Sequence, residues 1–216
     1  MDTLIHDLRD ITIRSISVSE MNNNVYLLTA KASGAQLLID AADDLPAIQA
    51  MLADAAADTA ATTKLAQIAT THQHWDHVRA LPALVAATGA PTIAGKDDAE
   101  ALPVPVDRIL EHGDTCAVDG FELTAVHLRG HTPGSIAFVY QDPEGPAHIF
   151  SGDSLFPGGV GNTQNDPERF TSLLDDVTAR LFEAYPDDTL VHPGHGSPTT
   201  LGAERPHLEV WRARGW

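Results

Sequence analysis

Residues 71–78, THQHWDHV, place three histidines and one aspartate within six consecutive positions. Imidazole and carboxylate groups are the ligands that zinc and similar divalent metals take from proteins. His72 and His74 lie two residues apart, a spacing that directs both rings to one side in extended or tight-loop backbone. Asp76 and His77 follow after a turn and can face a second point nearby. The stretch therefore predicts a metal site.

One short loop cannot supply the ligands of two metal ions. A dinuclear site, with metals about 3.5–4 Å apart, needs ligands from other segments and a group that bridges both ions. Three further residues are candidates because each lies at or just after the end of a predicted strand: His131, Asp153 and His195. Loops at the ends of strands are where a rigid scaffold usually holds its functional side chains.

The elements that must position these residues are short apolar runs alternating with helical segments. Residues 11–42 read as β and contain the predicted strands 24–30 and 35–41 (a hairpin with its turn at 31–34). Further predicted strands are 65–71, 91–95, 121–128, 135–141, 147–153 and 188–196, the last of which runs into a loop. The predicted helices are 45–58 after an Asp44 N-cap, 78–88 ending at Gly89, 166–186 after an Asp166 N-cap, and a short one in 204–216. This order predicts an α/β fold in which two sheets are covered by helices on the outside.

Length and charge narrow the class of protein. A chain of 216 residues suffices for one domain over 1–216, and its formal charge of -17 disfavours nucleic acid as a partner. We find no signal peptide and no run of the roughly 18–20 apolar residues that a membrane helix needs. Cys116 is the only cysteine, which fits a reducing compartment. We expect a cytoplasmic protein without membrane contacts, monomeric or homodimeric, that acts on a small molecule.

Four segments together resemble the metallo-β-lactamase fold superfamily, and within it the glyoxalase II-like hydrolases. They are THQHWDH (71–77), GHTPGS (130–135), SGDSLF (151–156) and HPGHG (192–196), in the order that the family has them. The resemblance implies an αββα four-layer sandwich with two divalent metal ions, Zn²⁺ first and Fe or Mn as alternatives, at one edge of the two sheets.

The resemblance also implies a role for each site residue. His72, His74 and His131 bind the first metal, Asp76, His77 and His195 bind the second, and Asp153 bridges both. Asp76 and Asp153 are the expected catalytic carboxylates, and Asp40 supports the metal loop from behind. True β-lactamases of the superfamily carry a cysteine in place of Asp153, which argues against lactam hydrolysis.

The expected reaction is hydrolysis of a small thioester, ester or lactone by a metal-bridging hydroxide. Glyoxalase II itself carries a C-terminal glutathione-binding domain, whereas here 21 residues follow His195, so we expect that domain to be lacking. One alternative is an oxidoreductase similar to persulfide dioxygenases, with a single iron on His72, His131 and Asp153. An RNA-processing nuclease is another, disfavoured by the acidic charge.

Other residues are weaker candidates. His127 flanks the predicted site in a supporting or a packing role, and the Gly-rich loop 156–163 is expected near its mouth. His192 is a less favoured ligand than His195. We expect Cys116 to be a small buried side chain. The histidines without partners nearby in the sequence are expected on the surface: His6, His112, His148 and His207.

Overall fold

The computed structural model describes residues 3–215. The first sheet has the strand order β1 (Leu4–Asp7), β2 (Ile11–Val18), β3 (Asn23–Ala30), β4 (Ala35–Ile39), β5 (Lys64–Thr70), β6 (Thr92–Gly95) and β7 (Arg108–Leu110). The second has the order β15 (Thr199–Thr200), β14 (Leu190–Pro193), β11 (His148–Gly152), β10 (Ile136–Tyr140), β9 (Phe121–His127) and β8 (Thr115–Val118). A small hairpin joins β12 (Leu155–Phe156) to β13 (Gly159–Val160).

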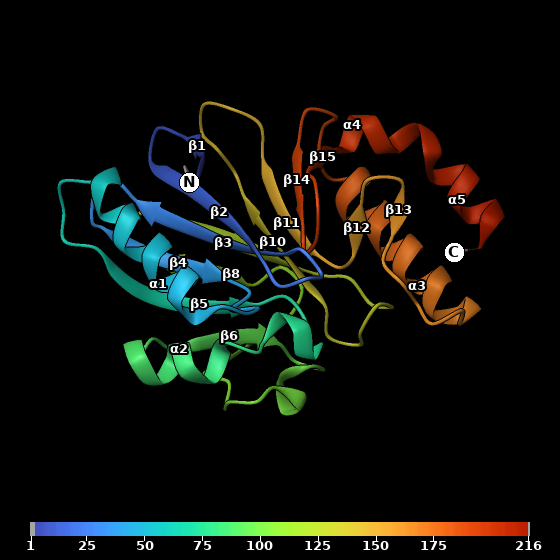
Figure 1. The fold of residues 1–216 in the computed structure, drawn as a ribbon. Helices are drawn as coiled ribbons and strands as arrows, with labels where there is room; N and C mark the ends of the chain where they lie inside the picture. The colour runs from blue at the N-terminus through green and yellow to red at the C-terminus, as the bar shows by residue number, and fades with distance from the viewer. Residues whose placement is uncertain (1–2, 216) are drawn as a thin grey trace.

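Helices cover the outer face of each sheet (Figure 1). Those on the first sheet are α1 (Leu45–Asp54) and α2 (Leu81–Thr88), and those on the second are α3 (Pro167–Val177), α4 (Leu201–Glu204) and α5 (Leu208–Arg214). The molecule is therefore the αββα sandwich that the resemblance implied. No helix among residues 3–215 is both long enough and apolar enough to cross a membrane.

Three apolar cores hold the four layers together. In β3, Tyr26 and Leu28 face the core between the sheets, whereas Val25 and Leu27 face the core beneath α1 and α2. A third core lies between the second sheet and its helices, and it includes the buried Trp211. Because side chains alternate along a strand and both faces of each sheet are covered, the central strands read as continuous apolar runs.

The predicted elements are present, with changes at their ends. β3 and β4 form the predicted hairpin, and Asp44 and Asp166 accept hydrogen bonds from the first turns of α1 and α3. The helix predicted from residue 78 begins instead at Leu81, because Val78, which follows the turn Trp75–His77, has φ −133° and ψ 8° and so lies outside the helical region. The helix predicted over 166–186 leaves the α form at Val177 and continues as a π turn, Thr178–Phe182.

Candidate metal centre

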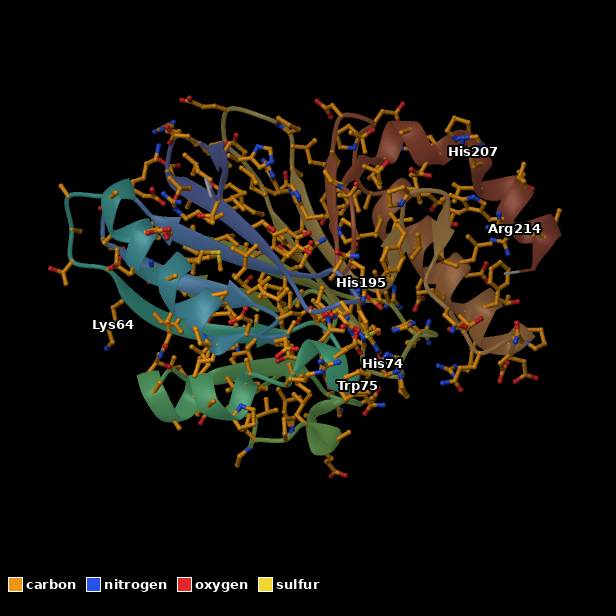
Figure 2. The ribbon with its side chains drawn as sticks, in the orientation of Figure 1. Lys64, His74, Trp75, His195, His207 and Arg214 are labelled. Atoms are coloured by element: carbon orange, nitrogen blue, oxygen red, sulfur yellow. The ribbon has the colours of Figure 1, made fainter. Side chains whose placement is uncertain are left out.

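Four strands end at one edge of the sandwich, and the predicted ligands follow them there. The 71–77 loop follows β5 of the first sheet, whereas His131, Asp153 and His195 follow β9, β11 and β14 of the second. Figure 2 shows His74, Trp75 and His195 close to one another where the two halves of the chain meet. Both sheets therefore contribute to a single site.

Three of the histidines form a first group. The ligand nitrogens of His72, His74 and His131 all lie within 4.8 Å of one another, and His72 Nε2 is 3.1 Å from His74 Nδ1. His72 and His131 are buried. Three imidazoles converging on one point form a suitable set of ligands for a divalent transition metal.

Asp76, His77 and His195 form a second group of the same size. The Nε2 atoms of His77 and His195 are 3.1 Å apart, and Asp76 Oδ2 lies 3.5 Å from the first and 3.3 Å from the second. Two imidazoles and one carboxylate offer a second point at which a metal ion could bind.

Asp153 lies between the two groups. Its Oδ1 is 3.4 Å from His77 Nε2, and its Oδ2 is 3.4 Å from His195 Nε2 and 3.6 Å from His131 Nε2. The structure thus brings the seven residues predicted as ligands into one cluster, with one carboxylate facing both groups.

Hydrogen bonds on the far side of the imidazole rings from the cluster determine which ring nitrogen is available to bind a metal ion. His131 Nδ1 donates to the carbonyl of Asn162 at 2.8 Å, and His195 Nδ1 donates to the carbonyl of Met21 at 2.9 Å. A carbonyl only accepts, so each of these nitrogens carries a proton, and in the neutral ring the lone pair lies on Nε2. Both lone pairs therefore belong to the atoms that face the cluster.

Asp40 fixes two further residues from behind. Its Oδ2 lies 3.0 Å from His77 Nδ1, and its carboxylate accepts from the amide and hydroxyl of Thr71, each at 2.7 Å. Thr71 Oγ1 is in turn 3.0 Å from His72 Nδ1. Asp40 has a left-handed backbone with φ 58°, an uncommon conformation for a residue other than glycine. These contacts orient Nε2 of both rings toward the cluster.

The charges in the cluster favour a bound cation. Burial lowers the pKa of His72 well below its usual value and also lowers that of His131. Burial acts in the same direction on His77, but its contacts with Asp153 and Asp40 outweigh it and raise the pKa of His77 to about 10. Burial raises the pKa of Asp153, yet the contacts with His195 and His77 hold it far below its ordinary range. An anionic bridge surrounded by imidazoles suits a metal ion, which binds as it displaces protons.

Two buried atoms of the cluster have no hydrogen-bond partner among residues 3–215: His131 Nε2 and Asp153 Oδ1. A buried polar atom without a partner costs free energy, so such atoms need a reason to persist. Coordination of a metal ion supplies one for both atoms. The residues present therefore fit a dinuclear metal site.

Two glycines make room for the cluster. A Cβ on Gly194 would lie 2.2 Å from Asp153 Oδ1, and one on Gly161 would lie 1.7 Å from the carbonyl oxygen of Asp153. Neither position can carry a side chain without displacing the candidate bridging residue. The close approach of these two loops explains why HPGHG and VGNT contain glycine at these positions.

Asp98 supports the site, although no pattern in the sequence marks it as a site residue. The residue is buried and accepts from the amides of Gln73 and Gly134 at 2.9 and 2.7 Å and from the hydroxyl of Thr132 at 2.6 Å. It thereby joins the first metal loop to the loop around His131. No motif surrounds it, and only the position of β6 beside β5 brings it to the site.

The start of β3 joins the site to the last part of the chain. Asn23 Nδ2 donates to Asp76 Oδ2 at 2.9 Å, and the residue pairs with His195 in an isolated bridge. The amide of Asn24 donates to the carbonyl of Gly194 at 2.8 Å. These contacts hold the second group of ligands in place from the side of the first sheet.

Arg169 of α3 and the 156–163 loop support His131. The Arg169 guanidinium donates to the carbonyls of Gly130 and His131. The loop, expected near the mouth of the site, supplies the Asn162 carbonyl that binds His131, and the ring of Phe156 lies 6.4 Å from that of His195. The loop is therefore part of the wall of the site.

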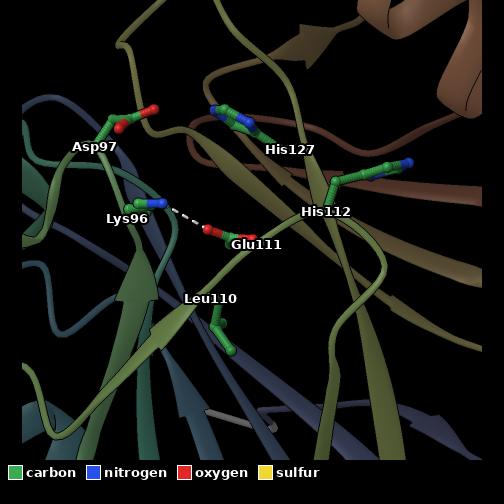
Figure 3. A pocket seen from close by; sticks show the side chains of 6 residues that line it. All are labelled: Lys96, Asp97, Leu110, Glu111, His112 and His127. Atoms are coloured by element: carbon green, nitrogen blue, oxygen red, sulfur yellow. Dashed lines mark hydrogen bonds and ion pairs between the residues drawn. The ribbon is translucent and has the colours of Figure 1, made fainter.

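A hollow of about 350 Å³ is lined by Lys96, Asp97, Leu110, Glu111, His112 and His127 (Figure 3). Lys96 and Glu111 form an ion pair at 2.7 Å on its wall, and both side chains are largely exposed, so this pair contributes little stability. His127 lines the hollow and donates through Nε2 to the Pro133 carbonyl at 2.7 Å. His127 therefore supports the 130–135 loop and takes no place in the ligand cluster.

A family model described as the metallo-beta-lactamase superfamily matches residues 18–195. A hydroxyacylglutathione hydrolase of Fuscovulum blasticum is 34% identical over 175 residues, which are 81% of this chain and 62% of that protein. The chain thus spans about three fifths of the length of this curated relative.

Two solved structures are similar over most of their length. TTHA1623 in a di-iron-bound form is 33% identical, with a TM-score of 0.71 over 88% of this chain and 96% of that one. ETHE1 from Myxococcus xanthus is 28% identical, with a TM-score of 0.77 over 93% of this chain and 84% of that one.

Proposed function

The chain belongs to the metallo-beta-lactamase superfamily, and from this premise we propose that it is a hydrolase with two divalent metal ions that cleaves a small thioester, ester or lactone. The observation that carries the proposal is the position of Asp153 between two groups of three ligands. A site for one ion has no need of the second group.

In this proposal, His72, His74 and His131 hold one ion, Asp76, His77 and His195 hold the other, and Asp153 bridges them. When bound, two such ions supply an acidified water as the nucleophile and polarise the substrate carbonyl. Asp40, Asn23 and the carbonyls of Met21 and Asn162 fix the ligand side chains that would hold the ions. Zn²⁺ is the first candidate metal, and the di-iron form of TTHA1623 supports iron as an alternative.

The mouth of the site suits a small, partly apolar substrate. Trp75, within the 71–77 ligand loop, is 60% exposed, and the Arg79 guanidinium lies 3.9 Å from the centre of its ring. Phe156 lies near His195 on the opposite loop. We assign these two rings to the walls that contact the acyl group. The relatives named hydroxyacylglutathione hydrolase make a thioester of glutathione the first substrate to test.

The same proposal covers the partners and the location of the protein. The charge of -17 supports a small molecule in preference to nucleic acid. Cys116 is buried, as expected, and burial raises its pKa to about 11, so this thiol has no part in the reaction. A single cysteine supports a cytoplasmic location.

Metal analysis and a substrate panel test the proposal. We expect about two metal ions per chain in untagged protein, and hydrolysis of an acylated glutathione, an aryl ester or a lactone that a strong chelator abolishes. His195→Ala should lower kcat/KM at least about a hundredfold, because even residues behind the ligands cost up to that much. His207→Ala, which replaces an exposed histidine far from the centre, serves as the matched control. Undiminished hydrolysis by metal-free protein would refute the proposal.

A mono-iron oxidoreductase is the second candidate, because two histidines and one carboxylate of the cluster match the set of ligands that a single iron takes in oxygen-using enzymes. It would use His72, His131 and Asp153 alone. One iron per chain, with consumption of oxygen and no hydrolysis, would establish it in place of the hydrolase.

A further inference from the structure

Three histidines outside the metal centre lie together between the two sheets. The ligand nitrogens of His6, His148 and His192 are all within 4.8 Å of one another, and this group shares no residue with the groups of the centre. His148 was expected on the surface, which was wrong: only 1% of it is exposed. Its partners come from β1 and β14, far away in the sequence.

The pairing of β11 with β14 explains how two of the rings meet. These strands are parallel, with Phe150 opposite His192, and His148 lies two residues before Phe150 on the same face of the sheet. His148 Nδ1 is therefore 3.0 Å from His192 Nε2. This separation is close to the 3.1 Å between the paired nitrogens of the main centre.

His6 completes the group from the first sheet. The centre of its ring lies 4.6 Å from that of His148 and 5.4 Å from that of His192, and it is steeply inclined to both. Since His6 is only partly buried, the cluster can be reached from solvent. A hollow of about 300 Å³, lined by His6, His192, Ser15, Asn24 and Tyr26 among others, leads to it.

From this geometry we propose that His6, His148 and His192 form a second metal site, for an ion that prefers imidazole ligands, such as Zn²⁺ or Cu²⁺. Three histidine ligands with a fourth position open to water are a known zinc geometry. Imidazole also suits copper and nickel, whereas Mg²⁺ and Ca²⁺ require oxygen ligands. The site is separate from the main centre and does not depend on the proposed hydrolase activity.

The protonation of the rings agrees with this proposal. Burial lowers the pKa of His148 to about 4 and that of His192 to about 3, and it also lowers the pKa of His6. All three rings are therefore neutral near pH 7, which is the form that binds metals. The proton shared between His148 Nδ1 and His192 Nε2 must leave that position when an ion binds, either to solvent or to the other nitrogen of the same ring.

Zinc binding by untagged protein tests the site. After dialysis against micromolar free zinc, wild type and His207→Ala should each hold one zinc more per chain than His6→Ala. The readout is this difference, so it is independent of the number of ions in the main centre. His6 is the residue to replace because it is the most exposed of the three, and circular dichroism establishes that the variant is folded.

Copper supplies a second readout. Cu²⁺ added to zinc-loaded protein should give an electron paramagnetic resonance spectrum with nitrogen couplings, and His6→Ala should weaken this binding at least tenfold. Because copper displaces zinc at either site, the zinc released is measured in parallel: zinc lost equally by wild type and His6→Ala comes from the main centre, whereas one further zinc lost by wild type alone comes from the cluster. Equal zinc contents in all three proteins, or a copper signal unchanged by His6→Ala, would show that the three histidines are only a packed group.

Discussion

Gly194 shows how a residue without a side chain can determine a metal site. The space beside its Cα is occupied by Asp153 Oδ1 and by the ring of His77, whose Cε1 would lie 2.8 Å from a Cβ at this position. Both neighbours are held by further contacts, so displacing either of them costs free energy. The absence of a side chain is thus as necessary here as the ligands are.

We predict that Gly194→Ala lowers the affinity for metal at least tenfold, because the added methyl group displaces the bridging carboxylate. Metal content after dialysis and competition with a coloured chelator measure the loss. Gly196→Ala is the control in the same loop, since a Cβ there meets nothing within 4 Å and only the backbone at φ +70° is strained. Equal affinities for the two variants would contradict the steric explanation.

At the scale of elements, Asp98 connects two loops that follow different sheets. The Asp98 carboxylate accepts hydrogen bonds from the backbone amides of Gln73 and Gly134. Without this carboxylate, buried N–H groups lose their partners, and each costs about 1–3 kcal/mol. The residue therefore contributes both to stability and to the position of the ligands.

Asp98→Ala should lower the free energy of unfolding by about 3 kcal/mol and weaken metal binding as well. Urea unfolding in the presence of a chelator measures the first effect separately from the second. Asp97→Ala, at the exposed neighbouring position, should change neither quantity appreciably. If both variants unfolded at the same urea concentration, Asp98 would have no structural role.

The elements also show how far the sequence could predict this protein. Apolar runs and caps revealed the long strands and helices, because burial on both faces leaves a clear pattern. The short strands β1, β7, β8, β12, β13 and β15 were not predicted, because a segment of only a few residues is too short to show the alternation of apolar and polar residues that marks a strand. The ligand motifs indicated the seven residues that the structure gathers. Asp98, Asn23 and His148 depend on contacts between distant segments, which spacing along the chain cannot reveal.

At the scale of the whole molecule, an ion pair links the helix layer to the first sheet. Arg14 of β2 contacts Asp58, just after α1, at 2.5 and 2.7 Å, and both side chains are at most 10% exposed. The hydroxyl of Thr12 donates to the same carboxylate. Burial raises the pKa of Asp58, but the contacts with Arg14 and Thr12 outweigh it and hold this pKa below its ordinary value of 3.8.

Asp58→Asn should lower the free energy of unfolding by roughly 3 kcal/mol at pH 7, because it removes the carboxylate that contacts the buried Arg14 guanidinium. A carboxyl with a lowered pKa stabilises the fold above its unfolded pKa and loses that contribution as the pH falls through the folded value. The difference from wild type should therefore shrink below about pH 4. Urea unfolding at several pH values in chelator measures it, with the exposed Asp54→Asn as control. A difference independent of pH would contradict the ion-pair explanation.

The contact between β3 and the loop 193–196 has a consequence for biosynthesis. His195 follows His72 by 123 residues, and it is fixed by Asn23 and Met21 from the beginning of the chain. A ribosome adds roughly 5–20 residues per second, so many seconds pass between the synthesis of the 71–77 loop and that of His195. During that time, His72, His74, Asp76 and His77 belong to a nascent chain that lacks His195. The complete centre can therefore take up metal only after residue 195 has been made.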